Sequence, residues 1–449
     1  MKLRIPDSWV RHIFEPLWDT YESSARLRTL RRLQKMQWQP LAAVMADQSK
    51  SLQLLVQHAS DTSPFYSERF AQAGIDPNKV RTIADLAKLP LLSKDDIRNH
   101  HADIFSTNYS PEELVSAKTG GSTGVALQVF CDQQGIELRA GAALLADEWS
   151  GWKLGEPIAA VWGNPPVPIT LKNKLRCLLK DRIIYLDTMR IDDAAIDAFL
   201  VGWQTMRPGM LYGHAHSIFI LCEALQQRGV KLKPTGVVAT SMMLIETERV
   251  VIEDVCGIKV TNRYGCEEVS LIACECEQHQ GLHLNSAHNI VEFLREDGTP
   301  CDYGEDGRLV ITELVNYGMP MIRYEVGDWG IPSDRVCSCG RGLPLMESVT
   351  GRTADFLVAT DGSRVAGISI IENSLTKISG IRQMQIVQDK AHHLTVNVVM
   401  GQDYSEATAE DLVMSLKQML GAEMQVDLNR VETIPQEKSG KYRFTKCLI

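Results

Sequence analysis

From about Val115 onward, short apolar runs typical of buried strands alternate with amphipathic helical stretches. The strand-like runs are residues 127–130, 158–162, 237–240 and 260–261, and residues 218–227 space their apolar side chains as a helix does. Strands that alternate with helices along a chain pack in layers, with the helices covering the sheet. The sequence therefore predicts a large α/β domain.

Segments with other patterns of apolar residues precede and follow this α/β region. Residues 38–58 repeat apolar side chains at helical spacing, Ser63 and Pro64 end that pattern, and another short helix is expected at residues 83–86. After Gly351 the pattern indicates a small α+β module. Its strands are expected near 356–359, 383–387 and 394–400, and its helices near 368–378 and 406–420. We predict an N-terminal domain of residues 1–354, with a helical region 1–110 and an α/β core 111–354, and a C-terminal domain of residues 355–449.

Composition and charge narrow the class of protein. The 449-residue chain has 44% hydrophobic and 23% charged residues, as globular proteins do, and a formal net charge of −9. Nucleic-acid binding requires a basic face, so we expect no nucleic-acid partner. The chain contains no run of 18 apolar residues and no apolar leader, which predicts neither a membrane span nor a signal peptide. The 11 cysteines, an odd number, favour reduced thiols or metal ligands, so a cytoplasmic enzyme is expected.

One segment between two strand-like runs combines glycines with hydroxyl side chains. It reads Lys118-Thr119-Gly120-Gly121-Ser122-Thr123-Gly124-Val125. Glycines let successive N–H groups point to one side and bind an anion, and hydroxyls add donors without bulk. The segment lacks the Lys-Ser/Thr pair of kinase and GTPase phosphate loops. We interpret it as a phosphate-binding loop, with a flexible surface turn as the alternative.

Two acidic motifs follow the expected strands. The first reads Arg263-Tyr264-Gly265-Cys266-Glu267-Glu268. A carboxylate there is suited to Mg²⁺, which binds one or two carboxylates together with phosphate oxygens and water. The second motif ends in Gly327-Asp328 after a strand, where a carboxylate can accept both hydroxyls of a ribose. Taken singly, each motif is also compatible with an ordinary polar turn.

Two cationic motifs lie near the C-terminus. Gly351 and Arg352 stand just before the expected domain boundary, and Ser439-Gly440-Lys441 stands in a basic tail. Negative charge develops when a carboxylate attacks phosphorus, and a well-placed ammonium stabilises it. A solvated loop and a solvated tail are the alternatives for these two motifs.

In their order and spacing, the motifs resemble those of acyl-adenylate-forming enzymes, and in particular the phenylacetate–CoA ligase branch. Two upstream segments also resemble the opening region of that branch. They read Ser63-Pro64-Phe65-Tyr66 and Leu89-Pro90-Leu91-Leu92-Ser93-Lys94-Asp95-Asp96-Ile97. The resemblance covers the chain from about Leu52 to its end. It implies a large α/β domain and a small mobile α+β lid domain, with ATP bound at their junction.

The resemblance implies roles for residues of the large domain. Glu268, four positions after Tyr264, would hold Mg²⁺, whereas its neighbour Glu267 would not. Asp328 would bind the ribose. The other nucleotide-binding residues implied are Thr119, Gly120, Gly121, Ser122, Thr123, Gly124, Tyr264, Gly265 and Arg352.

It also implies roles for two residues at and beyond the boundary. Lys441 would contact the carboxylate and the α-phosphate during acyl-AMP formation. The small domain would then rotate about Asp355, which would withdraw the lysine and open a path for an acceptor thiol. Relatives often carry a Ser/Thr-Gly-Glu word where this chain has Ala239-Thr240-Ser241-Met242-Met243-Leu244, so substrate identity stays open.

A dense set of metal-ligating side chains lies in two segments, 274–283 and 337–339. Cys276-x-x-His279 together with Cys337-x-Cys339 would form a Cys₃His set of the kind that structural Zn²⁺ prefers. Cys274 and His283 are rival ligands. The alternative is that the reduced cysteines pack as small apolar residues.

Together these features predict an ATP-dependent acid–thiol ligase that forms acyl-AMP and passes the acyl group to coenzyme A. One alternative keeps the adenylation but uses an amine, a hydroxyl or a carrier-protein thiol as acceptor, in a polysaccharide or cofactor pathway. A second alternative is an inactive scaffold that binds nucleotide or zinc. The identity of the acid and the oligomeric state are not readable from the sequence.

Overall fold

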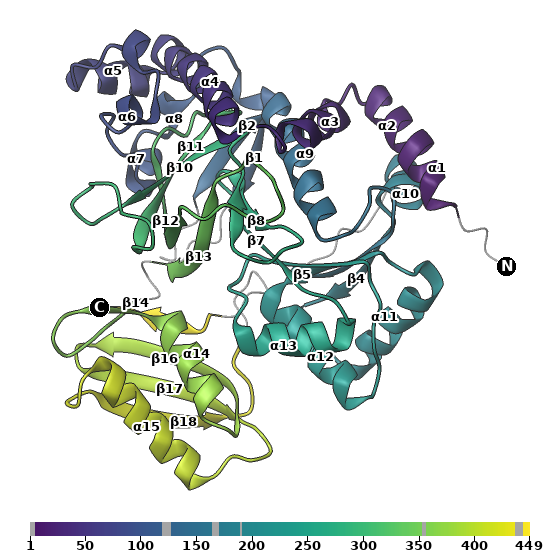
Figure 1. Cartoon of the computed structure of the whole chain (residues 1–449), viewed down its shortest axis with the longest axis vertical. Coiled ribbons are helices and arrows are strands. Elements are labelled where there is room, and N and C mark those ends of the chain that lie inside the picture. The colour runs from purple at the N-terminus through teal and green to yellow at the C-terminus, as the bar shows by residue number, and fades with distance from the viewer. Residues whose placement is uncertain (1–4, 119–126, 164–169, 189–190, 353–355, 436–442) are drawn as a thin grey trace.

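The computed structural model describes residues 5–118, 127–163, 170–188, 191–352, 356–435 and 443–449. A large sheet lies at the centre, helices of the first hundred residues lie at one end, and a separate α+β layer lies below (Figure 1). This arrangement confirms the predicted fold class, a large α/β part followed by a smaller α+β part.

The central sheet of the described residues has eleven strands in the order β10-β11-β12-β13-β9-β8-β7-β6-β5-β3-β4. The strands are β3 (Ile158–Trp162), β4 (Ile183–Asp187), β5 (Met210–His214), β6 (Gly236–Thr240), β7 (Thr261–Cys266), β8 (Ser270–Glu275), β9 (Leu282–Leu284), β10 (Asn289–Leu294), β11 (Gly307–Glu313), β12 (Tyr324–Ser333) and β13 (Leu345–Arg352). Neighbours from β4 to β7 are parallel, and the pairs from β7 to β10 along the sheet order are antiparallel. The predicted strands at 158–162, 237–240 and 260–261 are confirmed as β3, β6 and the start of β7.

Helices cover this sheet, as the alternating pattern predicts. They include α9 (Gln133–Trp149), α10 (Leu171–Arg176), η4 (Cys177–Asp181), α11 (Asp193–Met206), α12 (Ala215–Gln227) and α13 (Glu246–Cys256). α12 buries Ile218, Leu221 and Leu225 in a core that it shares with β5, β6 and α13. Because β5 leads into α12 and β6 precedes α13, the carboxyl ends of the parallel strands lie at one edge, the usual place for a ligand in such sheets.

The first hundred residues are helical, as predicted. Their elements are α1 (Asp7–Trp9), η1 (Val10–Phe14), α2 (Glu15–Tyr21), α3 (Arg26–Met36), α4 (Leu41–Thr62), α5 (Pro64–Gln72), η2 (Pro77–Lys79), α6 (Ile83–Leu86), α7 (Lys94–Asn99) and α8 (His101–Ile104). Pro64 opens α5 because its fixed φ suits a first helical turn. Among the described residues, no helix combines the length and the apolar character needed to cross a bilayer.

A short η3 (Pro111–Glu113) leads from these helices into an antiparallel hairpin. The hairpin consists of β1 (Leu114–Lys118) and β2 (Gln128–Asp132), with Lys118 paired to Gln128 at its open end. The predicted strand at 127–130 is confirmed as β2. The hairpin therefore places Lys118 and Gln128, on the two sides of the glycine- and hydroxyl-rich segment, next to each other.

The C-terminal part forms a four-stranded sheet in the order β18-β17-β16-β19 with two helices. Its elements are β14 (Phe356–Val358), β15 (Arg364–Ala366), α14 (Gly367–Lys377), β16 (Ile381–Lys390), β17 (His393–Met400), α15 (Glu406–Leu420), β18 (Gln425–Val431) and β19 (Thr445–Cys447). The predicted strands and helices of the α+β module are confirmed. The boundary expected at Asp355 lies outside the described residues and stays a prediction.

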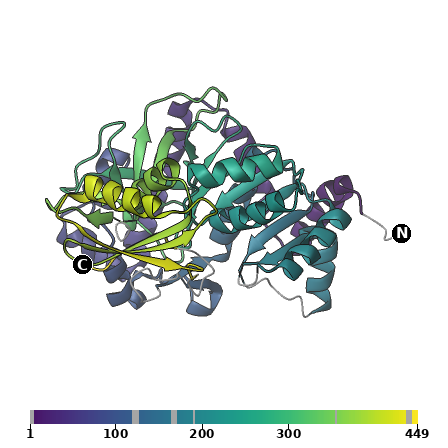
Figure 2. The same ribbon diagram turned by 90° about the horizontal axis from the view of Figure 1, so that it is seen from below.

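The C-terminal part packs on α12 and α13 of the large part (Figures 1 and 2). Ile245, just before α13, is buried in the C-terminal apolar core, and Met243 packs against it. Arg382 of β16 forms an ion pair of 2.8 Å with Glu223 of α12. Met243 belongs to residues 239–244, where this chain differs from its relatives. One of the two methionines of that segment thus contacts the C-terminal core.

A buried polar pair lies in the same interface. His216 and Glu248, on α12 and α13, are hydrogen-bonded to each other, and the other ring nitrogen of His216 lies 3.2 Å from the side-chain nitrogen of Gln383. The ring of Phe444 meets the His216 ring edge-on at 5.2 Å. His216 is the second residue after β5, so Phe444 lies at the edge of the sheet where the parallel strands end.

Candidate active site and metal-ligand group

Tyr264 and Asp328 join two motifs that are far apart in the sequence. The Tyr264 hydroxyl on β7 donates a hydrogen bond of 2.7 Å to Oδ2 of Asp328 on β12. Asp328 is buried, with only 7% of its surface exposed. A Cβ atom on Gly265 would lie 2.4 Å from the carbonyl oxygen of Ser270, so the close approach of β7 to β8 requires glycine.

Glu268 lies in the turn between β7 and β8 and is buried, whereas Glu267 is exposed. The Tyr324 hydroxyl donates a 2.9 Å hydrogen bond to Oε1 of Glu268. Arg139 on α9 donates a 2.8 Å hydrogen bond to the Glu268 carbonyl oxygen and pairs with the buried Glu313. Burial, with the nearby carboxylate, raises the pKa of Tyr324, so its hydroxyl stays protonated and orients the carboxylate.

Asp328 and Arg352 are partners in the antiparallel register of β12 and β13. The strand pairing therefore places the backbone of the predicted ribose ligand opposite that of the predicted nucleotide-binding arginine. Thr119, Gly120, Gly121, Ser122, Thr123, Gly124, Asp355 and Lys441 lie outside the described residues. Their assigned roles stay predictions.

Lys94, a cation at the start of α7, lies near Gly327, the residue before Asp328. Its Nζ lies beside the backbone of Gly327, 3.5 Å from the position of a Cβ atom. Leu92 positions it, because Leu92 N–H donates to the Arg323 carbonyl oxygen at 2.8 Å and its own carbonyl accepts from Glu325 N–H at 2.9 Å. The sequence motifs indicate no role for Lys94, and only the pairing of its segment with β12 reveals its position.

A buried network of charged and aromatic side chains joins β3, β5 and β7. Arg263 donates to Asp147 of α9 and to the Tyr212 hydroxyl, both at 2.6 Å. The Tyr212 ring stacks on Trp162 at a centroid distance of 5.4 Å. Burial raises the pKa of Asp147 to about 6, against the lowering effect of the adjacent arginine. The network holds these three strands relative to one another next to Tyr264.

The structure brings three of the predicted zinc ligands together with the rival histidine, His283. Cys276, Cys337, Cys339 and His283 place their ligand atoms within 4.8 Å of one another, and His279 is not in this group. His279 instead has Nδ1 3.3 Å from a Glu275 carboxylate oxygen. Its three-residue spacing from Cys276 made it plausible, but β9 pairs antiparallel with β8 and returns His283 to the cysteines.

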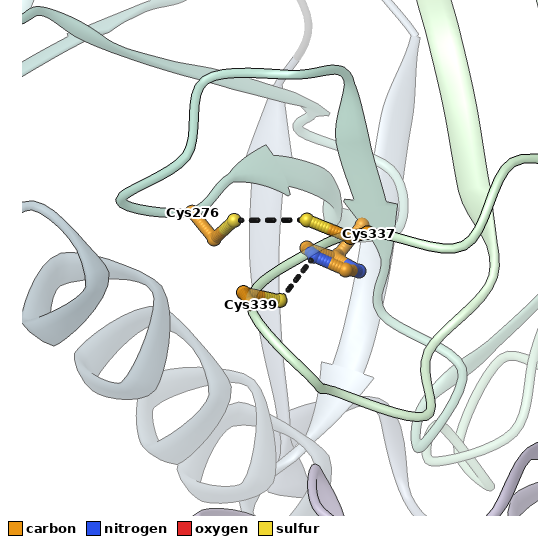
Figure 3. A group of neighbouring side chains, drawn as sticks. Cys276, Cys337 and Cys339 are labelled. Carbon is orange, nitrogen blue, oxygen red and sulfur yellow. Dashed lines mark hydrogen bonds between the residues drawn. The ribbon is translucent and has the colours of Figure 1, made fainter.

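The geometry of this group fits a tetrahedral metal. Cys276 and Cys337 have sulfurs 3.6 Å apart, and Cys339 Sγ lies 3.3 Å from His283 Nε2 (Figure 3). With Zn–S bonds of about 2.3 Å, the edge of a tetrahedron is roughly 3.8 Å. The other ring nitrogen of His283 lies 3.3 Å from the Leu343 carbonyl oxygen, which accepts its proton and leaves Nε2 for a metal. Burial lowers the pKa of His283 to about 4, so the ring is neutral at pH 7.

Known proteins resemble the chain over its C-terminal module and over most of its length. A family model described as the CapK C-terminal domain matches residues 357–447. Phenylacetate-coenzyme A ligase of Thermus thermophilus is 26% identical over 328 residues, covering 71% of this chain and 72% of the relative. Protein CapK of Staphylococcus aureus is 21% identical over 403 residues, covering 88% of each chain.

The fold resembles that of a solved ligase. The crystal structure of 2-hydroxyisobutyryl-CoA ligase in the postadenylation state superposes with a TM-score of 0.75 at 18% identity, covering 92% of this chain and 91% of that one. An open conformation of the same enzyme, in complex with 2-HIB-AMP and CoA, superposes with a TM-score of 0.63. At this level of identity, the likeness establishes a shared fold.

Proposed function

Because the chain belongs to the phenylacetate–CoA ligase-like branch of the adenylate-forming enzymes, we propose that it joins a carboxylic acid to coenzyme A with ATP. In the first half-reaction a carboxylate oxygen bonds to the α-phosphorus of ATP and pyrophosphate leaves, which forms acyl-AMP. In the second, the thiolate of coenzyme A attacks the acyl carbon and AMP leaves. The relatives' names and the acyl-AMP complexes of the similar structure support this sequence of steps.

One observation carries the proposal: two hydrogen bonds gather two acidic motifs at one place. Tyr264 holds Asp328, and Tyr324 holds Glu268, so two buried carboxylates are oriented by hydroxyl donors beside the strand ends. A ribose needs an acceptor for its hydroxyls, and Mg²⁺ on phosphate oxygens needs a carboxylate. Asp328 and Glu268 would meet these two needs, with Mg²⁺ reducing the negative charge of the phosphates.

Lys441 is proposed as the mobile cation of the first half-reaction. It precedes Phe444 by three residues, and Phe444 packs on His216 just beyond the end of β5. Arg443 is anchored nearby, because its carbonyl oxygen accepts a 2.6 Å hydrogen bond from Gln385. Lys441 is two positions before Arg443 in the sequence, so its role at the strand ends is proposed from this anchor. Thr119, Ser122 and Thr123, between the two strands of the hairpin, would bind the phosphates.

The test is an ATP–pyrophosphate exchange screen of the purified protein against aromatic, aliphatic and hydroxylated carboxylic acids. We expect at least one acid to stimulate exchange, and addition of coenzyme A to give an acyl-CoA detected by mass spectrometry. ATP binding without exchange for any acid would favour the inactive scaffold. Acyl-AMP that is trapped by hydroxylamine but gives no coenzyme A thioester would favour a different acceptor.

We also infer that Cys276, Cys337, Cys339 and His283 bind a structural Zn²⁺. Four protein ligands leave no open coordination position for catalysis. Glu268 precedes β8 and Cys276 follows it, so the two sites lie at opposite ends of a six-residue strand, about 20 Å in length. The metal would tie the β8–β9 turn to the segment between β12 and β13.

Metal analysis tests this inference with a matched pair of histidines. We expect about one equivalent of zinc in protein prepared without chelator, a large loss of zinc in His283→Ala and no loss in His279→Ala. Zinc retained by His283→Ala and lost by His279→Ala would restore the ligand set predicted from spacing. Absence of zinc from the unmodified protein would leave the thiols as packed, reduced cysteines.

A further inference from the structure

Two helical segments at the end of the molecule opposite α15 carry a row of exposed apolar side chains. α1, η1 and α2 form a continuous helical run, and α10 with η4 forms a second one beside it (Figures 1 and 2). Side chains spaced by three or four residues lie on one side of a helix. We call the following exposed residues the apolar face: Trp9, Ile13, Leu17, Tyr21, Leu171, Leu175 and Leu178.

The inner side of these helices buries charged side chains as well as the apolar Val10, unlike an ordinary surface helix. Glu15 and Asp19 of α2 and Lys180 of η4 are buried, with 4%, 5% and 7% exposure. They pair with each other and with Arg26: Lys180 Nζ lies 3.3 Å, and Arg26 Nη2 2.9 Å, from Asp19 Oδ1. A helix at a protein–water boundary normally buries its apolar stripe and exposes its charges. Here the charges join the two helices and the apolar stripe points outward, which indicates that another apolar surface covers it.

We propose that the apolar face binds the same face of a second copy of this chain across a twofold axis. The exposed fractions of its seven side chains add up to about four whole side chains, or roughly 800 Å² at about 200 Å² each. The largest apolar patch of a monomer is typically about 300–600 Å². A stable interface buries about 800 Å² on each partner, so the face has the area of a homodimer contact.

The charges around the face favour a second copy over a lipid surface. Lys172 pairs with Glu22 and Arg176 pairs with Asp181, both at 3.1 Å, and Lys174 of α10 is exposed as well, so the rim carries charges of both signs. Lys180 points inward and is buried. The net charge of −9 would also repel the chain from anionic lipid headgroups. An apolar centre with a mixed-charge rim suits a self-complementary interface.

Light scattering coupled to size-exclusion chromatography of the full chain tests the proposal. We expect twice the chain mass of 50.1 kDa for the unmodified protein and a single chain mass for Leu175→Glu. Leu17→Ser, a milder change on the other helical run, should raise the dimer dissociation constant at least tenfold. Leu54→Glu is the matched control, because Leu54 on α4 is 65% exposed and lies outside the face, and it should remain dimeric.

Acid-dependent pyrophosphate exchange by each variant reports whether it is folded. A single chain mass for the unmodified protein at all concentrations would overturn the proposal, as would a dimer that persists in folded Leu175→Glu and Leu17→Ser. Binding of the monomeric protein to vesicles containing phosphatidylglycerol, lost in Leu175→Glu, would assign the face to a membrane instead and would also overturn it.

Discussion

Replacing Tyr264 by phenylalanine removes one hydroxyl and leaves the ring in place. In the structure this hydroxyl donates a 2.7 Å hydrogen bond to Oδ2 of Asp328, the proposed ribose ligand. Without it, the carboxylate loses a donor that sets its orientation toward bound nucleotide. The substitution therefore tests whether the two motifs act as one nucleotide site.

The size of the effect follows from the kind of hydrogen bond that is lost. Hydrogen bonds to charged groups contribute about 1.5–3 kcal/mol. Since about 1.4 kcal/mol corresponds to a factor of ten, the affinity for ATP should fall roughly 10- to 150-fold. Tyr264 is only partly buried, so solvent screening favours the lower end, about tenfold.

The assay is acid-dependent ATP–pyrophosphate exchange at varied ATP concentration. In the proposed reaction no bond of the ribose changes, so KM for ATP should rise about tenfold while kcat changes little. Tyr303→Phe, which removes an exposed hydroxyl on a loop, should leave both constants unchanged. If KM for ATP stays the same in Tyr264→Phe while Asp328→Ala raises it, the tyrosine does not position the carboxylate and the reasoning is wrong.

Two further perturbations probe charge in the site and in the core. Lys441→Ala should lower acid-dependent exchange more than about a hundredfold, because a transition-state charge contact is lost. Lys446→Ala in β19 is the control and should keep the rate of the unmodified protein. Equal exchange rates in the two variants would contradict the role assigned to Lys441. Burial, with two nearby arginines, lowers the pKa of His288 in the folded protein to about 3. In the unfolded chain the pKa of a histidine is about 6.5, so between about pH 3 and pH 6.5 only the unfolded chain binds the proton. This contribution to stability is complete above pH 6.5 and is lost as the pH falls, by about 2 kcal/mol at pH 5. In urea unfolding at pH 7 and pH 5, His288→Leu should lack this part of the loss while the exposed His12→Gln retains it; an equal loss in both variants would contradict the assignment.

Local periodicity was enough to predict elements whose burial follows a simple pattern. β3 and α15 occupy the predicted residues 158–162 and 406–420. The antiparallel strands β8 to β13 were not predicted individually. Most of them pair with the next strand along the chain, but β13 pairs with the distant β9, and bulges shift the register between β12 and both of its neighbours. The register and the distant strand pair depend on contacts between residues that do not occur together in a short stretch of sequence.

For the candidate site, the motif order predicted residue types but not their partners. The bonds from Tyr264 to Asp328 and from Tyr324 to Glu268 each join residues more than fifty positions apart. Lys94 reaches the Gly327 turn only because Leu92 pairs with β12. The sequence could name the chemical groups, since these are fixed by residue type, but their distances depend on how strands return.

The sequence alone determined an α/β protein with a separate α+β end and carboxylate motifs suited to a nucleotide. Tertiary structure decided that His283 rather than His279 joins the three cysteines, because β9 folds back on β8. It also decided which side of the first helices faces outward. Burial depends on what packs against a stripe, and here buried ion pairs hold the polar side inward while the apolar side meets solvent.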